Sequence, residues 1–169
     1  MFIEALNGFD APVYLILKDH PTITLSKATD EYKRIFVEYQ EVLKNLRVGM
    51  IVNSSDLTSQ EVCAGSDIVV GMYSTMTVEA CYMRKPMLTI WTPEIEQSLL
   101  KVLNNTLSEW PLSNLGASLR AGTVPEIKNC LQKIITGDTA AMLNAQQKHF
   151  QADGLSGHRV AEAILSYYK

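Results

Sequence analysis

The stretch "SDIVVGMYSTMTVEACYMRKPMLTI", residues 66–90, decides the fold. Two short apolar runs enclose a segment whose apolar residues are spaced as they are in a helix. The runs at residues 67–72 and 86–91 predict strands, and residues 75–85 predict the helix between them. A strand, a helix and a second strand in this order indicate a parallel pair joined by a right-handed crossover.

The same alternation continues in both directions along the chain. Further strands are expected at residues 13–18, 48–52 and, at an edge of the sheet, 115–119. Helices are expected at residues 1–8, 28–46, 58–66, 94–105, 124–136, 139–151 and 156–168. Thr58 and Glu61 have the spacing of a capping box. Because the strands are apolar throughout, helices should cover both faces of the sheet. We therefore predict an α/β fold, a Rossmann-like three-layer sandwich with a mostly parallel sheet.

Length and composition favour one globular domain. The chain has 169 residues, of which 47% are hydrophobic and 20% charged, and a formal net charge of −3. This charge gives no support for nonspecific binding to nucleic acid. No apolar run approaches the roughly 20 residues of a membrane span, and the N-terminus does not resemble a signal peptide, so we expect a cytoplasmic protein. Cys63, Cys81 and Cys130 are widely spaced and predict buried thiols, and no metal site or cofactor is expected.

Ligands of an open parallel sheet bind at the carboxyl ends of its strands. At the end of the first strand, "LILKDHP" places Lys18 and His20 two residues apart, hence on one side of an extended chain. Pro21 favours an extended His20. A cation and an imidazole there suit a phosphate oxygen. The alternative is a histidine that only bonds neighbouring backbone.

Two adjacent hydroxyls, Ser74 and Thr75, follow Tyr73 where the third strand should give way to a helix. One of them would cap the helix. The second, together with the free N–H groups of the first turn, could bind an anion. Glu79 does not have the capping-box spacing from either hydroxyl. It lies about 6 Å further along the helix, where it could accept hydrogen bonds from the ribose of a bound nucleotide, or it is an exposed acid favoured by the helix dipole.

The second strand is followed by the polar stretch "NSSD". Asn53, its first residue, could contact a base edge or a ribose, or the stretch could be a simple turn. Near the C-terminus, Arg159 stands in the first turn of the last helix, where the helix dipole disfavours a cation. We expect it to pair with Asp153 or to reach a partner domain.

In combination, "LILKDHP", "SDIVVGMYSTMTVEACYMRKPMLTI" and the final "DG" with Arg159 resemble the C-terminal, nucleotide-binding half of a GT-B glycosyltransferase. The pattern is similar to bacterial sialyltransferases and to CDP-glycerol or capsule polysaccharide transferases, over roughly residues 10–168. The resemblance implies that His20, Ser74 and Thr75 contact the nucleotide phosphate, and we expect Lys18 and Tyr73 to bind substrate at the same site. It departs at "MRKP", where Arg84 replaces the usual small residue.

The resemblance further implies that Glu79 holds the ribose and that His20 stabilises the leaving phosphate. The substrate would be a CMP-, CDP- or UDP-linked sugar. The chain would be one domain, residues 1–169, without the N-terminal domain that usually supplies the catalytic base. The resemblance is also compatible with peripheral membrane association of the full-length enzyme. The alternatives are half of a sugar-nucleotide 2-epimerase and a noncatalytic α/β module that docks onto a partner.

Overall fold

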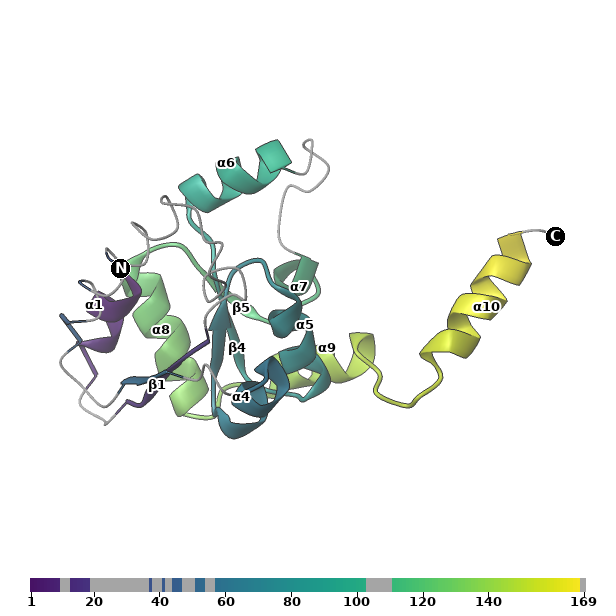
Figure 1. Ribbon diagram of the computed structural model, residues 1–169, viewed down its shortest axis with the longest axis horizontal. Helices are drawn as coiled ribbons and strands as arrows, with labels where there is room; N and C mark the ends of the chain where they lie inside the picture. The colour runs from purple at the N-terminus through teal and green to yellow at the C-terminus, as the bar shows by residue number, and fades with distance from the viewer. Residues whose placement is uncertain are drawn as a thin grey trace.

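All the described strands are short and parallel. The computed structural model describes residues 1–9, 13–18, 37, 41, 44–46, 51–53, 57–102 and 111–167 (Figure 1). In one group, β1 (Leu15–Leu17) pairs with β2 (Ile51–Asn53). In the other, β4 (Met87–Ile90) lies between β3 (Val69–Gly71) and β5 (Leu119–Ala121). The predicted parallel α/β arrangement is confirmed.

The helices of the described residues follow the strands in the expected alternation. They are α1 (Phe2–Leu6), α4 (Ser59–Gly65), α5 (Thr75–Tyr82), α6 (Pro93–Val102), α7 (Pro111–Asn114), α8 (Val124–Ile135), α9 (Ala140–His149) and α10 (Ser156–Tyr167). The capping box of Thr58 and Glu61 is present at the start of α4. Most of the helix predicted for residues 28–46 lies outside the described residues.

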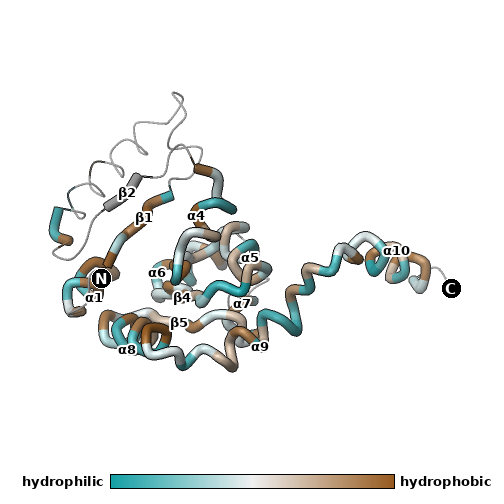
Figure 2. The backbone as a smooth tube through the Cα atoms, turned by 90° about the horizontal axis from the view of Figure 1, so that it is seen from below, coloured by the Kyte–Doolittle hydropathy of each residue, from teal (hydrophilic) through white to brown (hydrophobic). Residues whose placement is uncertain are grey.

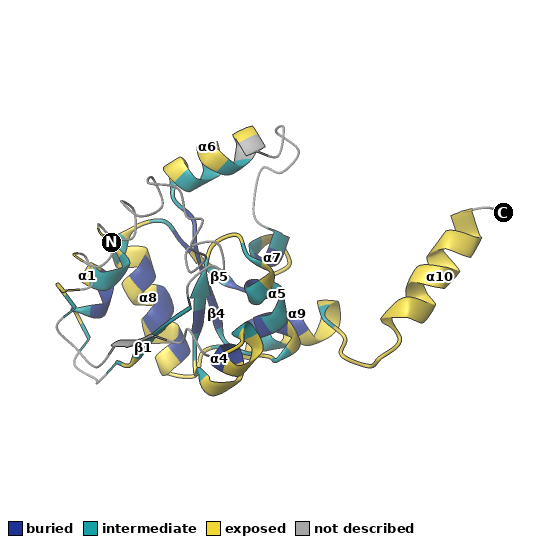
Figure 3. Ribbon diagram, in the orientation of Figure 1, coloured by how far each residue is buried: buried dark blue, intermediate teal, exposed yellow. Residues whose placement is uncertain are grey.

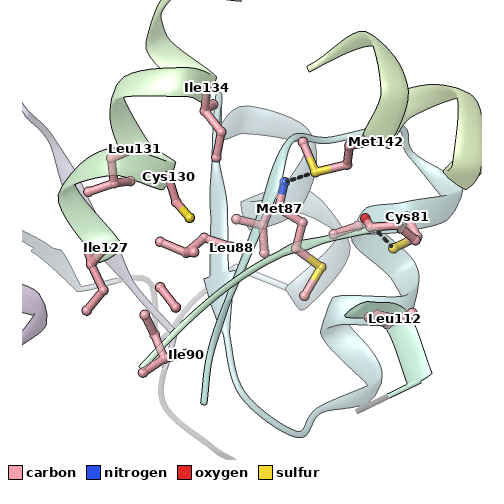
Figure 4. Packing of buried hydrophobic residues seen from close by; sticks show 14 of the residues in the cluster. Cys81, Met87, Leu88, Ile90, Leu112, Ile127, Cys130, Leu131, Ile134 and Met142 are labelled. Atoms are coloured by element: carbon pink, nitrogen blue, oxygen red, sulfur yellow. Dashed lines mark hydrogen bonds between the residues drawn. The ribbon is translucent and has the colours of Figure 1, made fainter. Parts of the chain in front are cut away.

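Helices cover both faces of the three-stranded sheet, as a Rossmann-like three-layer sandwich requires. On one face α8 packs against β4 and β5 and is itself flanked by α1. On the other face α5 packs against β3 and β4, with α9 and α4 beside it. Successive residues of β4 point to opposite faces, so Leu88 lies near Cys130 of α8, while Met87 lies near Met142 of α9 (Figure 4). The core is therefore built on both sides of β4, whose four residues are all buried.

Two predicted boundaries that fall on described residues differ from those of the described elements by three residues or more. The edge strand expected at residues 115–119 begins only at Leu119. The residues before it form the turn that ends α7, where Gly116 has φ +70° and Ala117 donates its N–H to the carbonyl of Leu112. The helix expected over residues 75–85 ends at Tyr82, because Arg84 adopts a left-handed conformation with φ 52°.

The last helix, α10, stands apart from the layers. It projects away from the sheet (Figure 1), and none of its described residues is buried (Figure 3). It carries hydrophobic as well as hydrophilic residues (Figure 2), and Val160 and Ile164, four residues apart, are both more than half exposed. In the described part of the chain, no helix combines the length and apolar character needed to cross a bilayer.

Candidate functional site at the carboxyl ends of the strands

The carboxyl edge of the three-stranded sheet is lined with capped helix N-termini. Because β3, β4 and β5 are parallel, the links that follow them all leave from this edge. Each link ends in a hydroxyl residue that accepts a hydrogen bond from the first turn of the next helix. These residues are Ser74 before α5, Thr92 before α6 and Thr123 before α8. Several partly satisfied backbone N–H groups, and the positive ends of three helix dipoles, therefore face one edge.

One of the two adjacent hydroxyls caps the helix, as predicted, and it is that of Ser74. The hydroxyl of Ser74 accepts a hydrogen bond from the backbone N–H of Met76, at 3.2 Å, and so is the N-cap of α5. Thr75 is the first helical residue and is exposed, and its hydroxyl has no hydrogen-bond partner among the described residues. A third hydroxyl, that of the buried Thr77, donates to the carbonyl of Ser74 and fixes the turn. The Ser74 hydroxyl therefore caps the helix, the Thr77 hydroxyl supports the cap, and the Thr75 hydroxyl remains available.

Glu79 is not the exposed acid of the alternative interpretation. It is half-buried, and Gln60 of α4 donates a hydrogen bond from Nε2 to its Oε1 atom, at 2.8 Å. Its other oxygen, Oε2, is buried and has no donor within the described part of the chain. A buried carboxylate oxygen without a donor costs free energy. The carboxylate therefore retains acceptor capacity, one helical turn beyond Thr75.

The Glu79 carboxylate lies close enough to Cys63 to influence its thiol. Burial raises the pKa of Cys63, and the negative charge of Glu79 raises it further, while Lys85 partly opposes this. Burial also raises the pKa of Cys81, to about 11. All three cysteines are free and buried, as predicted. Since thiols with raised pKa values remain protonated near neutral pH, they are unsuited to act as nucleophiles.

The remaining predicted residues are only partly placed. Lys18 directly follows β1 and is half-buried, and Asn53 is the last residue of β2, in register with Leu17. Asn53 therefore lies within a strand and not in the predicted loop, and its backbone ends at the same edge as that of Lys18. Tyr73 is 47% exposed beside the Ser74 cap. His20 lies outside the described residues, and so do residues 54–56 of the "NSSD" stretch.

Two further residues at the carboxyl edge of the three-stranded sheet were not predicted. Trp91 directly follows β4 and is buried, and the Cζ atom of Arg120 lies 5.8 Å from the centre of its ring. This distance allows a cation–π interaction. The indole Nε1 of Trp91 is buried without a partner among the described residues. Next to it, the backbone of Gly122 approaches the Trp91 carbonyl so closely that a Cβ atom would lie 2.6 Å from the oxygen.

Comparison with known proteins does not assign the chain to a family. No protein-family model matches the chain, and no curated protein matches it in sequence. Among the described residues, no three His, Cys, Asp or Glu side chains lie together as a metal site would require.

Proposed function

We propose that this chain is the donor-binding half of a cytoplasmic glycosyltransferase of the GT-B type. The observation that carries the proposal is the start of α5. There, a capped helix N-terminus, an available hydroxyl on Thr75 and a carboxylate with spare acceptor capacity on Glu79 follow one another within two turns. The first two suit an anion such as phosphate. The third suits a sugar hydroxyl. A nucleoside phosphate carries both groups at a comparable separation.

The chemistry of this half would be stabilisation of the leaving group. In glycosyl transfer an acceptor hydroxyl attacks the anomeric carbon of the donor sugar. The bond from that carbon to the phosphate oxygen breaks, and the phosphate departs with the electron pair. The N–H groups of α5, the hydroxyl of Thr75 and the cations Lys18 and His20 would offset the growing negative charge. A protonated His20 could also donate to the phosphate.

The base that activates the acceptor would come from a second domain. The exposed apolar residues of α10 support a partner, because an amphipathic helix normally buries its apolar stripe. In this proposal that helix contacts the second domain. The noncatalytic module also requires a partner, so the two proposals differ in whether nucleotides bind.

Nucleotide binding can be measured directly. We expect titration of the chain with CMP, CDP or UDP to show weak binding of at least one of them, by calorimetry or by shifts in amide NMR spectra. Thr75→Ala should weaken binding by roughly tenfold, since a hydrogen bond to a charged group contributes about 1.5–3 kcal/mol. Thr139→Ala is the matched control, because the Thr139 hydroxyl also lies at the start of a helix and makes no cap hydrogen bond. A folded chain that binds none of the three nucleotides contradicts the proposal.

A further inference from the structure

Gln60 and Glu79 join two helices that follow consecutive strands of the chain. α4 follows β2 and α5 follows β3, and the two helices pack side by side. Gln60 lies in the first turn of α4 and is exposed, whereas Glu79 lies in the second turn of α5 and is half-buried. The 2.8 Å hydrogen bond between them spans 19 positions of sequence. It fixes the carboxylate from the side of α4.

The bond leaves the two carboxylate oxygens in different situations. Oε1 accepts from Gln60, while the buried Oε2 accepts from no donor in the described ranges. A carboxylate holds its charge best when several donors reach it. Oε2 is shielded from bulk water, so a ligand hydroxyl reaches it only when the side chains beside the two helices shift to admit it. Such a hydroxyl would supply the donor that this oxygen lacks.

We propose that Gln60 is a positioning residue that occupies one oxygen of Glu79 and so presents the other to the ribose of a bound nucleotide. This inference rests on the function proposed above. A ribose offers two adjacent hydroxyls as donors, and a 2′-deoxyribose offers one fewer at the same place. The pair should therefore discriminate between ribonucleotides and their 2′-deoxy counterparts.

Cys63 provides a readout of the position of Glu79 that needs no ligand. The charge of Glu79 is the second cause of the raised pKa of the Cys63 thiol, after burial. If Gln60 holds the carboxylate in place, its loss lets the charge move, and the pKa of Cys63 falls toward its value in Glu79→Gln. A Gln60 that only joins the surfaces of two helices would leave this pKa unchanged.

The experiment compares Gln60→Leu, which removes the donor, with Gln60→Lys, which retains one. Binding of CMP, CDP and UDP and of their 2′-deoxy counterparts is measured by calorimetry, and the Cys63 pKa by NMR of ¹³Cβ-labelled cysteine. We expect Gln60→Leu to lower ribonucleotide affinity about tenfold, with little effect on the 2′-deoxy forms, and to lower the Cys63 pKa. Gln60→Lys should restore the discrimination. Gln97→Leu, at an exposed position of α6, is the control.

The outcomes separate this inference from the proposed function. If wild type binds nucleotides but Gln60→Leu weakens both sugar forms equally or neither, the positioning role is wrong and the proposed function stands. If wild type binds no nucleotide, the proposed function fails, and with it the discrimination between sugars. An unchanged Cys63 pKa in Gln60→Leu overturns the positioning role in either case.

Discussion

Ser74 accepts a hydrogen bond from the backbone N–H of Met76, whereas the neighbouring Thr75 hydroxyl has no partner among the described residues. The two hydroxyls should therefore respond differently to removal. Ser74→Ala removes the cap of α5 and should lower the free energy of unfolding by about 1 kcal/mol. Thr75→Ala should change it by less than about 0.5 kcal/mol. Urea denaturation of both variants checks this, and equal losses would show that the cap is shared.

Arg84 adopts a left-handed backbone conformation, with φ 52°, just after the end of α5. A side chain with a Cβ atom is disfavoured there, and glycine is not. Arg84→Gly should raise the free energy of unfolding by about 0.5–1 kcal/mol. Arg84→Ala, which keeps the Cβ atom, is the control and should not. Thermal unfolding of the two variants distinguishes relief of backbone strain from loss of the arginine charge.

Asp153 holds Arg159 at the start of α10, with 2.7 Å between Oδ2 and Nη1. Hydrogen bonds from Arg159 and from the backbone of Leu155 lower the pKa of Asp153 from 3.8 to about 2. Since this pKa is lowered in the folded chain, the contact is complete above about pH 4 and is lost as the pH falls through about 2. Arg159→Ala should return the pKa toward 3.8. NMR titration of the carboxyl carbon measures it, and an unchanged pKa would mean that the pair does not form in solution.

Gly122 follows β5 and contacts the carbonyl oxygen of Trp91, which a Cβ atom would approach to 2.6 Å. Because that oxygen belongs to the backbone, the strand end has to shift to admit a methyl group. Gly122→Ala should therefore lower the free energy of unfolding by roughly 1–3 kcal/mol. Gly65 is the matched control, since nothing lies within 4 Å of a Cβ atom built there. Gly65→Ala should leave stability unchanged or slightly raised, and an equally mild Gly122→Ala would contradict the close contact.

Local features of the fold could be predicted from the sequence, because they depend on neighbouring residues. The cap at Ser74 and the capping box of Thr58 and Glu61 are each complete within a single helical turn. The start of β5 was predicted too early in the chain. The apolar stretch "LGASL", which leads into the strand, also contains the turn that ends α7. Apolar character alone does not distinguish a strand from a tight buried turn.

The site was harder to predict wherever two elements meet. Nothing in the sequence pairs Gln60 with Glu79 or Arg120 with Trp91, since both contacts depend on how separate elements pack. A tryptophan as the last residue of a predicted strand was a usable signal, because the carboxyl end of a parallel strand lies at the ligand-binding edge. The pairing of Arg159 with Asp153 was one of two alternatives, and the structure shows this pair.

The lack of any buried residue in α10 has a consequence for amide hydrogen exchange. A helix of 12 residues that buries none of them is only marginally stable in water. Its amide protons should exchange with solvent deuterons almost as fast as those of an unstructured peptide, whereas those of β4 exchange only when the whole core opens. Slow exchange in α10 would then show that another surface covers this helix, so its exchange rate provides a direct test for a binding partner.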